Sequence, residues 1–587
     1  MFKNLFSKKN MPIIIIVSVA VALSIVMITI GSVRLLKPLG GKFDGTNSGG
    51  SSSGLTENSK PLDENFDGTN SGDSSSSGSN GSFDNSTTKP NTLLNPEYYE
   101  KVEYVPMPTL DNVTLTESEM LEKYRGYTDW RIYSIRTAKD EIKPAAGCTA
   151  YYVSNKGSSK NDGLSPETPF ASIGDLGKIK SQLKAGDVIY FERGSIFRGQ
   201  IYADVAGITY AAYGEGKKPE IYASPGDGAK VGTWEQTKEN KNVYKYSLNF
   251  GDRDIGTIVF NGGEKHAIKC TIRVEEDGST TNQTTGKKFS TYADLDENLH
   301  FFHDYKDTGY LYLYCKDGNP AEVFDSIEFS IKKYMIDVKA DNIRVDNLCF
   351  KYGGAHGIGA GTRNGLTVTN CEFGWIGGSI QMVGKAGGIH DVRYGNAIEI
   401  YGGCDRYTVT NCYFYQVYDA AVTFQYGTTD EKSNITMKNI NISDNVMEKC
   451  NYSFEYFLSG GTPETSYIQD VSINNNLMWY SGYGLCEQRP DKKADAHIKN
   501  WDDPRNVRGK FEINNNLFAI SRNDLVQSNG HSVVGSPSYS GNTYIQFLNA
   551  SLGRSGNVKT KVIFDNKVRE SIKSMLGDTK SKIIFVK

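Results

Sequence analysis

Three acidic residues, Glu399, Asp419 and Glu455, have the types and spacing needed for acid–base chemistry. The two glutamates each follow an inward apolar residue of a short predicted strand, so both side chains should face outward. Thr423 has the same place in the strand between them, and strands about 4.8 Å apart put the glutamates roughly 9–10 Å apart. Carboxyl groups about 6.5–9.5 Å apart cleave a glycosidic bond with inversion, and groups about 5–5.5 Å apart with retention. The spacing favours inversion, although Asp419, on the turn before the middle strand, could pair more closely with either glutamate.

This prediction depends on one alignment of six strands. The inward apolar residues are Ile358, Ile398, Val422, Phe454, Leu485 and Val526. The outward column after them is Gly359, Glu399, Thr423, Glu455, Cys486 and Gln527. The column before them, also predicted to face outward, is mostly small: Gly357, Ala397, Ala421, Ser453, Gly484 and Leu525. We expect a shallow groove for a polymer across the strands, whereas a slip of one residue would turn both acids inward.

Several polar and aromatic residues lie near these acids in the alignment. The candidates for binding substrate hydroxyls are His356, Asn396, Tyr401 and Gln425. Two long insertions, 374–393 and 488–508, flank the same face, and binding residues are often found on such loops. Trp501, in the second insertion, could stack on a sugar ring or could anchor its loop.

The element that positions these residues is a repeat. Six similar segments begin at Ile343, Leu366, Tyr407, Ile440, Val471 and Phe511, at intervals of 23, 41, 33, 31 and 40 residues. Each has apolar residues at its first and third positions, Asn or Asp at the fifth, and Phe or Met at the eighth. Strands that cannot bury their apolar face alone must stack on one another. The sequence therefore predicts an all-β fold, a right-handed parallel β-helix, with the fifth position forming an asparagine ladder at a bend.

The rest of the folded part surrounds this solenoid. We expect a lead-in at 96–150 with a helix opened by the capping box Thr116-x-x-Glu119, the β-helix at 151–545, and a C-terminal cap at 546–587. A second helix should begin after Ser172 and continue to Leu183. Residues 224–333 break the repeat and predict an inserted β-rich subdomain, with a hairpin of 299–302 and 310–314.

The N-terminus has a different composition. Residues 1–10 contain three lysines, and 11–33 form an apolar run that can span a bilayer and continues without a small-residue cleavage site. Residues 34–95 are rich in Gly, Ser and Asn and predict a disordered linker. We expect a single transmembrane signal anchor with a cytoplasmic N-terminus and an extracellular C-terminal domain, although the lysines before the run are balanced by cations after it.

Charge and cysteine content exclude some classes. The net charge of −3 with mixed signs argues against a nucleic-acid partner. Nine cysteines without a regular spacing favour buried free thiols over disulfides, and Cys371 and Cys412 should stack in a corner. No motif indicates a cofactor, and Ca²⁺ is possible only through acids assembled from several coils.

Two runs carry a resemblance to a known family. YVSNKGSSKNDGLSPETPFASI, beginning at Tyr152, and AGDVIYFERGSIFRG, beginning at Ala185, resemble the start of secreted bacterial β-helix proteins of the pectate-lyase-like superfamily. The resemblance covers 151 to about 530 and implies the fold, while the superfamily includes hydrolases, lyases, epimerases and adhesins. The paired aspartates of polygalacturonases and the pectate lyase motifs are absent. The chain thus resembles the glycoside-hydrolase-like branch, without a motif that transfers catalytic residues.

These observations lead to three alternatives. We expect a membrane-tethered extracellular glycoside hydrolase acting on a polysaccharide or oligosaccharide. A polysaccharide lyase or epimerase is the second alternative, with Arg393 or Lys385 as the cation that such chemistry needs. The third is a non-catalytic surface protein that binds glycan or cell wall.

Overall fold

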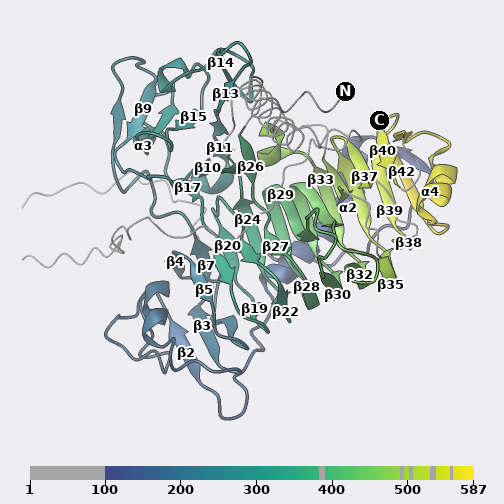
Figure 1. Ribbon diagram of the computed structural model, residues 1–587, viewed down its shortest axis with the longest axis horizontal. Coiled ribbons are helices and arrows are strands. Elements are labelled where there is room, and N and C mark those ends of the chain that lie inside the picture. The colour runs from purple at the N-terminus through teal and green to yellow at the C-terminus, as the bar shows by residue number, and fades with distance from the viewer. Residues whose placement is uncertain (1–98, 383–390, 490–494, 502–506, 529–536, 556–559) are drawn as a thin grey trace, which may run out of the picture. The chain divides into compact units, whose positions relative to one another are not determined.

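The computed structural model describes residues 99–382, 391–489, 495–501, 507–528, 537–555 and 560–587, and its main body is a parallel β-helix (Figure 1). Its strands pair with equivalent strands of the next coil in parallel register. Consecutive coils therefore stack as the repeat predicts. The right-handed connection that we expect is the usual one for parallel crossovers.

Three faces make up each coil. The first face contains β7 (Glu220–Tyr222), β20 (Cys349–Lys351), β24 (Glu372–Ile376), the first halves of β29 (Tyr413–Tyr426) and β31 (Val446–Leu458), β33 (Leu477–Ser481), β36 (Leu517–Ser521), β39 (Thr543–Phe547) and β42 (Lys582–Val586). The second face contains β5 (Ile201–Ala203), β18 (Ile336–Val338), β21 (Ile358–Ala360), β27 (Ile398–Tyr401), the second halves of β29 and β31, β34 (Ala496–Asn500), β37 (Asp524–Ser528) and β40 (Ser551–Arg554).

The third face carries the strands of the six sequence repeats. Its members are β2 (Ala150–Val153), β3 (Val188–Glu192), β6 (Thr209–Tyr213), β19 (Arg344–Asp346), β23 (Thr367–Thr369), β28 (Cys404–Thr410), β30 (Thr436–Ser443), β32 (Tyr467–Asn474), β35 (Val507–Asn514) and β38 (Ser538–Ser540). The candidate acids lie on the second face, which follows the first along each coil.

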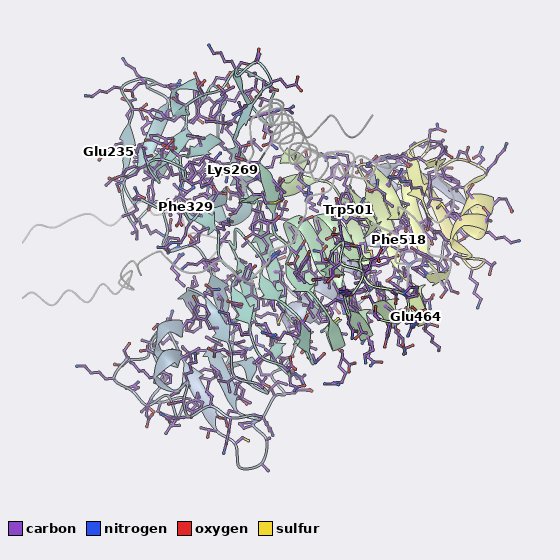
Figure 2. The ribbon with its side chains drawn as sticks, viewed as in Figure 1. Glu235, Lys269, Phe329, Glu464, Trp501 and Phe518 are labelled. Atoms are coloured by element: carbon purple, nitrogen blue, oxygen red, sulfur yellow. The ribbon has the colours of Figure 1, made fainter. Side chains whose placement is uncertain are left out.

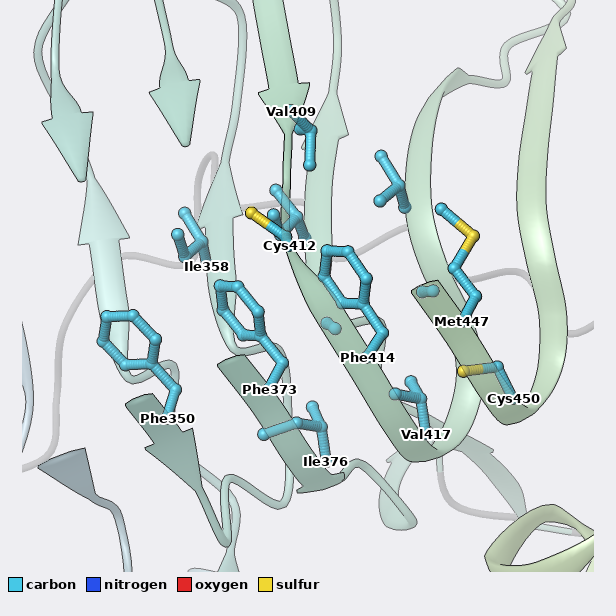
Figure 3. Close-up of a cluster of buried hydrophobic side chains, with 14 of the residues drawn as sticks. Phe350, Ile358, Phe373, Ile376, Val409, Cys412, Phe414, Val417, Met447 and Cys450 are labelled. Atoms are coloured by element: carbon cyan, nitrogen blue, oxygen red, sulfur yellow. The ribbon is translucent and has the colours of Figure 1, made fainter. Parts of the chain in front are cut away.

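The interior is a column of stacked apolar side chains. Phe350, Phe373 and Phe414 stack with ring centroids 5.0 and 5.1 Å apart, and Cys412, Met447 and Cys450 continue the same core (Figure 3). All nine cysteines are free thiols, and eight of them are buried. The expectation of buried thiols instead of disulfides is confirmed.

The asparagine columns differ partly from the prediction. The fifth-position residues Asn347, Asn370, Asn411, Asp444, Asn475 and Asn515 all have positive φ, as expected for a bend. The continuous buried ladder, however, is formed by the next position: Asn445, Asn476, Asn516 and Asn542, linked by side-chain hydrogen bonds of 3.0–3.1 Å. In the fifth-position column Asn411 donates to Asn370 at 2.6 Å, as expected, but Asn475 is exposed, so this column does not form a continuous ladder.

The column of small residues that the sequence predicts to face outward faces the interior instead. Ala397 and Ala421 belong to the main core, and a Cβ on Gly357 would lie 3.1 Å from the Phe373 ring. These small residues therefore lie at an inner corner of the coil. Larger side chains there would collide with the stacked phenylalanine rings of the core. They do not line an outer groove.

Two predicted helices have different outcomes. The helix α2 (Glu117–Arg136) begins at Thr116 with the expected capping box, and it covers the outside of the first face through Met120, Tyr124 and Ile132. The helix expected from Ser172 to Leu183 does not form. Only a short 3₁₀ helix, Ile173–Lys178, occupies the start of this segment. Gly174 and Gly177 explain this result, because glycine is a poor helix former.

The inserted segment forms small sheets of its own, as expected. One sheet contains β12 (Ile268–Lys269), β15 (His300–His303), β16 (Leu311–Tyr314), β9 (Val243–Tyr246) and β8 (Trp234–Gln236). A second contains β11 (Lys265–His266), β10 (Ile255–Phe260) and β17 (Ile327–Ile331), and β13 (Ile272–Val274) pairs with β14 (Thr280–Asn282). The predicted hairpin is β15–β16.

The chain ends with the helix α4 (Val568–Leu576) and β42, which pairs with β39 and with β1 (Val113–Leu115). Among the described residues no helix is long and apolar enough to cross a bilayer. The predicted anchor at 11–33 and linker at 34–95 lie outside those residues.

Candidate active site

The second face brings the predicted acids into one column. Glu399 pairs with Thr423, and Thr423 pairs with Glu455, so the expected register is confirmed for these three residues. Gly359 precedes Glu399 in the same column. The two glutamates are thus two strands apart, or roughly 9–10 Å between backbones.

The next position of the column differs from the prediction. Lys499, not Cys486, pairs with Glu455, and Gln527 follows it. Cys486 lies in a 3₁₀ helix, Gly484–Gln488, before the strand β34. The alignment failed here because Leu485 resembles an inward strand residue, while the strand itself, Ala-His-Ile-Lys-Asn, begins eleven residues later. A cation beside the acids was therefore missed.

Glu399 is held by a set of neutral donors. Its Oε2 accepts hydrogen bonds from the side-chain amides of Asn396, at 2.6 Å, and Gln425, at 2.9 Å. His356 Nε2 lies 3.1 Å from Oε1, although the angle is not that of a hydrogen bond. The backbone N–H of Asn396 donates to His356 Nδ1, so the neutral ring carries its proton on Nε2, facing Glu399. Three of the predicted binding residues thus orient an acid.

Asp419 owes its place to a β-bulge. Val417 pairs with Cys450 and Ala420 pairs with Tyr452, so two residues of β29 oppose one residue of β31. Such a bulge re-aims a side chain. Asp419 is buried and accepts a hydrogen bond of 2.8 Å from the equally buried Arg489. This ion pair joins the second insertion to the corner of the coil.

Glu455 is a buried acid with one oxygen bound to Trp501. The indole N–H of Trp501 donates to its Oε1, whereas Oε2 is buried without a partner among the described residues. Burial and the charge of Asp419 raise the pKa of Glu455 to about 8, with a further contribution from Glu399 and against the effect of the Trp501 hydrogen bond. Glu455 therefore holds a proton near neutral pH.

Trp501 and Lys499 form the side of the site next to Glu455. The Lys499 ammonium lies 3.5 Å from the centroid of the Trp501 indole and donates to Gln527 at 2.5 Å. The Trp501 ring meets Tyr452 edge-on, at 6.0 Å. Figure 2 shows Trp501 over the parallel strands and Lys269 in the insertion. The sequence left two roles open for Trp501, a loop anchor or a contact to substrate. In the structure its indole N–H contacts Glu455.

Tyr401 is set apart from the acids. It follows Glu399 by two residues on the same strand, and its hydroxyl donates to the Gly427 carbonyl at 3.4 Å. Its ring packs near Tyr426, at 5.4 Å. It borders the column without touching the carboxylates.

Several buried polar atoms at the column have no partner in the part of the chain that the structure describes. They are His356 Nε2, Thr423 Oγ1 and Glu455 Oε2. Native proteins leave few such atoms, so each needs an explanation, and a ligand is one. His356 lies just before β21, Thr423 on β29 and Glu455 on β31, and hydroxyl groups of a bound molecule would supply partners for these atoms.

No group of three or more His, Cys, Asp or Glu residues suited to a metal occurs within the described ranges. Two cavities of the described chain are lined mainly by residues of the insertion, and none of the three acids lines either of them. The larger, of about 360 Å³, is lined by residues that include Lys269, His303, Tyr305 and Asp391. The acids themselves are 1–3 % exposed. Substrate access to them therefore requires covering side chains such as Trp501 to move.

No family model and no curated protein matches the chain. Among solved structures, XylC in complex with xylose is 12% identical, with 71% of this chain and 73% of that chain covered and a TM-score of 0.40. The GH136 lacto-N-biosidase from Eubacterium ramulus is also 12% identical, with 80% of this chain and 72% of that chain covered and a TM-score of 0.31. Pectate lyase Pel9A is 12% identical, covering 71% and 74%, with a TM-score of 0.31. Further similar solved structures are a glycoside hydrolase and a rhamnogalacturonan lyase.

Proposed function

We propose that this protein is a glycoside hydrolase that acts on a polysaccharide or oligosaccharide outside the cell, with Glu455 as the general acid. The observation that carries the proposal is the buried Glu455 carboxyl, whose Oε2 has no partner among the described residues and whose pKa is raised to about 8 by burial and by Asp419. A general acid must hold a proton at the working pH and must have a free oxygen to deliver it.

Glu399 is the proposed base. Two side-chain amides donate to its Oε2 and orient the carboxyl group. The strand that carries Thr423 lies between the strands of Glu399 and Glu455. A water molecule near the Thr423 hydroxyl would lose a proton to Glu399 as it attacks the anomeric carbon. The glycosidic C–O bond breaks, and the leaving oxygen takes the proton of Glu455. This is inversion, and the backbone spacing supports it.

Asp419 has a different proposed role. Its charge ranks above that of Glu399 among the carboxylates that raise the pKa of Glu455. Arg489 forms a buried ion pair with Asp419 at 2.8 Å. We assign Asp419 as the group that keeps Glu455 protonated, with direct participation as base or nucleophile as the alternative.

The test is a screen of the purified protein against plant and bacterial polysaccharides, with and without chelator. New reducing ends without absorbance from unsaturated products would support hydrolysis, and activity in chelator would support a reaction without a resident metal. Glu455→Gln should lose at least about 100-fold in kcat. The matched control is Glu512→Gln, a carboxylate on the third face that pairs with Ser538 and should keep full activity.

A polysaccharide lyase is the second candidate, favoured by one observation. Lys499 pairs with Glu455 in the column, so a cation lies where a lyase needs one to stabilise a uronate carboxylate. Arg393, the cation expected from the sequence, donates instead to the Gly378 and Gly256 carbonyls and to Gln488. Lys385 lies outside the described residues. Unsaturated products in the same screen would support the lyase. Glycan binding without any product would support a non-catalytic binding protein.

A further inference from the structure

Tyr202 lies on the same outward column as the candidate acids, three strands before Glu399. It pairs with Asp337, Asp337 pairs with Gly359, and Gly359 pairs with Glu399. Steps of about 4.8 Å place its backbone roughly 14 Å from that of Glu399 along the axis of the β-helix. In Figure 1, β5 and β27, which carry the two residues, belong to the same run of parallel strands.

The side chain of Tyr202 is unusual for a strand residue of this fold. It is 57% exposed, while its neighbours Ile201 and Ala203 are buried in the core. Lys339 lies 5.4 Å from the ring centroid and also forms an ion pair of 3.1 Å with Asp337. Packing does not require the ring to be here, since it covers no apolar cluster.

The residues between Tyr202 and Glu399 continue an aromatic surface. A Cβ on Gly359 would lie 2.9 Å from the Tyr334 ring, so that ring covers the column at this position. Tyr334 in turn lies 5.1 Å from the His356 ring, beside Glu399. The order along the column is therefore Tyr202, the Asp337–Lys339 pair, Tyr334, and the acids.

We propose that Tyr202 is a distal sugar-binding subsite, on which a ring of an extended glycan stacks while another part of the same chain lies at Glu399 and Glu455. Single exposed aromatics are common and need no explanation by themselves. What distinguishes Tyr202 is its register with the acids and the aromatic and hydrogen-bonding side chains between them. The substrate class is thus a polysaccharide or long oligosaccharide that spans several strands, and this inference rests on the proposed function.

The experiment compares a polysaccharide that the full-length protein cleaves with a short aryl glycoside of the same sugar. Tyr202→Ala should raise the KM for the polymer about tenfold, the effect of losing one well-placed aromatic contact, and should leave the kcat and KM for the short substrate unchanged. Tyr202→Phe keeps the ring and should behave as the parent. Tyr104→Ala is the matched control, because Tyr104 is 60% exposed and its ring contacts Trp130 of α2, the helix that covers the first face.

Equal kinetics of Tyr202→Ala and parent on both substrates would overturn the subsite. A parent protein without turnover would reject the proposed hydrolase instead. In that case, affinity electrophoresis in gels containing each polysaccharide tests the subsite independently of catalysis. Retardation of the parent and of Tyr202→Phe, but not of Tyr202→Ala, would support the subsite. Equal retardation of all variants, or retardation of none, would refute it.

Discussion

At the scale of single residues, Glu455 should control the pH dependence of activity. Burial and Asp419 raise its pKa to about 8, and a general acid works only while it holds its proton. We expect kcat/KM to fall as the pH rises through about 8. Asp419→Asn removes one of the charges that raise the pKa, so the alkaline limb of the profile should move to lower pH.

Trp501→Phe makes the opposite shift and serves as the paired control. The indole N–H bond lowers the pKa of Glu455, so its loss should move the alkaline limb to higher pH. The measurement is kcat/KM between pH 4 and 10 for the parent and both variants. Identical profiles for all three would show that Glu455 is not the titrating acid.

The same residue makes a prediction on stability. A carboxyl whose folded pKa exceeds its unfolded value stabilises the fold below the unfolded pKa, and this contribution is lost as the pH rises through the folded pKa. For Glu455 the window extends from about 4.5 to about 8. Glu455→Gln should therefore gain stability relative to the parent as the pH increases across this window, as measured by Tm. A constant difference in Tm would contradict the raised pKa.

Much of the site could be predicted from the sequence at this scale, because alternation determines which strand residues face outward. Glu399, Thr423 and Glu455 were aligned correctly from their apolar neighbours Ile398, Val422 and Phe454. Lys499 was not predicted, since an insertion of irregular length precedes its strand. The hydrogen bond from the Asn396 backbone N–H to His356 also has no local signal, because it depends on a contact between coils.

At the scale of elements, the buried asparagine ladder should contribute to stability more than the bend column beside it. Asn476 accepts from Asn445 and donates to the Ile442 carbonyl and to Asn516. Asn476→Ala leaves these buried groups without partners, so we expect a loss of about 1–3 kcal/mol or more in the free energy of unfolding. Urea denaturation measures it.

Asn475 provides the matched control. It precedes Asn476, is exposed and has φ of 59°, a conformation that glycine adopts readily. Asn475→Gly should therefore change the free energy of unfolding little. A loss as large as that of Asn476→Ala would mean that the bend column also carries the ladder.

The helix α2 is joined to the first face by buried charges as well as by apolar packing. Arg136 makes two hydrogen bonds of 2.9 Å to Glu372. Burial alone would raise the pKa of Glu372, but the charge and hydrogen bonds of Arg136 lower it to about 2. Arg136→Ala should cost up to about 3 kcal/mol at pH 7, the low end for a broken buried pair, because the Arg136 side chain is 31% exposed.

The pH dependence of this loss separates it from simple packing. Glu372 stabilises the fold above its unfolded pKa of about 4.5, and the contribution is lost as the pH falls through about 2. The difference between parent and Arg136→Ala should therefore narrow below pH 4.5. Lys101→Ala, which breaks an exposed pair with Glu103, should have little effect at any pH.

Element types were easier to predict than element lengths. The capping box correctly predicted where α2 begins, and the repeat predicted the strands of the third face. Gly174 and Gly177 account for the short 3₁₀ helix after Ser172, whereas the bulge at Asp419 depends on how the chain turns between faces. The sequence pattern does not contain that information.

At the scale of the whole described chain, the Gln488 side chain is one connection between the insertion and the candidate site. Gln488 Oε1 accepts from the Lys269 backbone N–H, at 3.1 Å, and from Arg393, at 3.0 Å. The next residue, Arg489, holds Asp419. Lys269 itself pairs with the buried Asp254, which also accepts from the Ile380 backbone N–H at 2.6 Å. The subdomain thus supports the loop that supplies Arg489.

The placement of the protein in the cell is a proposal that depends on the N-terminal sequence. Residues 11–33 are apolar and long enough to span about 30 Å of hydrocarbon, and three lysines precede them. We propose that they anchor the protein in the membrane, with the linker at 34–95 separating the β-helix from the bilayer. The full chain should then sediment with membranes and resist extraction by high salt or carbonate.

A chain that begins at residue 34 tests this proposal, because it keeps the linker and the folded part and loses only the apolar segment. We expect it in the soluble fraction, with the same glycan activity as the full chain per mole of protein. Protease added to intact cells should remove the activity of the anchored protein, since the linker has no core to protect it. Activity that survives protease in intact cells but is lost after lysis would place the β-helix on the cytoplasmic side and reverse the orientation, whereas a full chain that is soluble would reject the anchor.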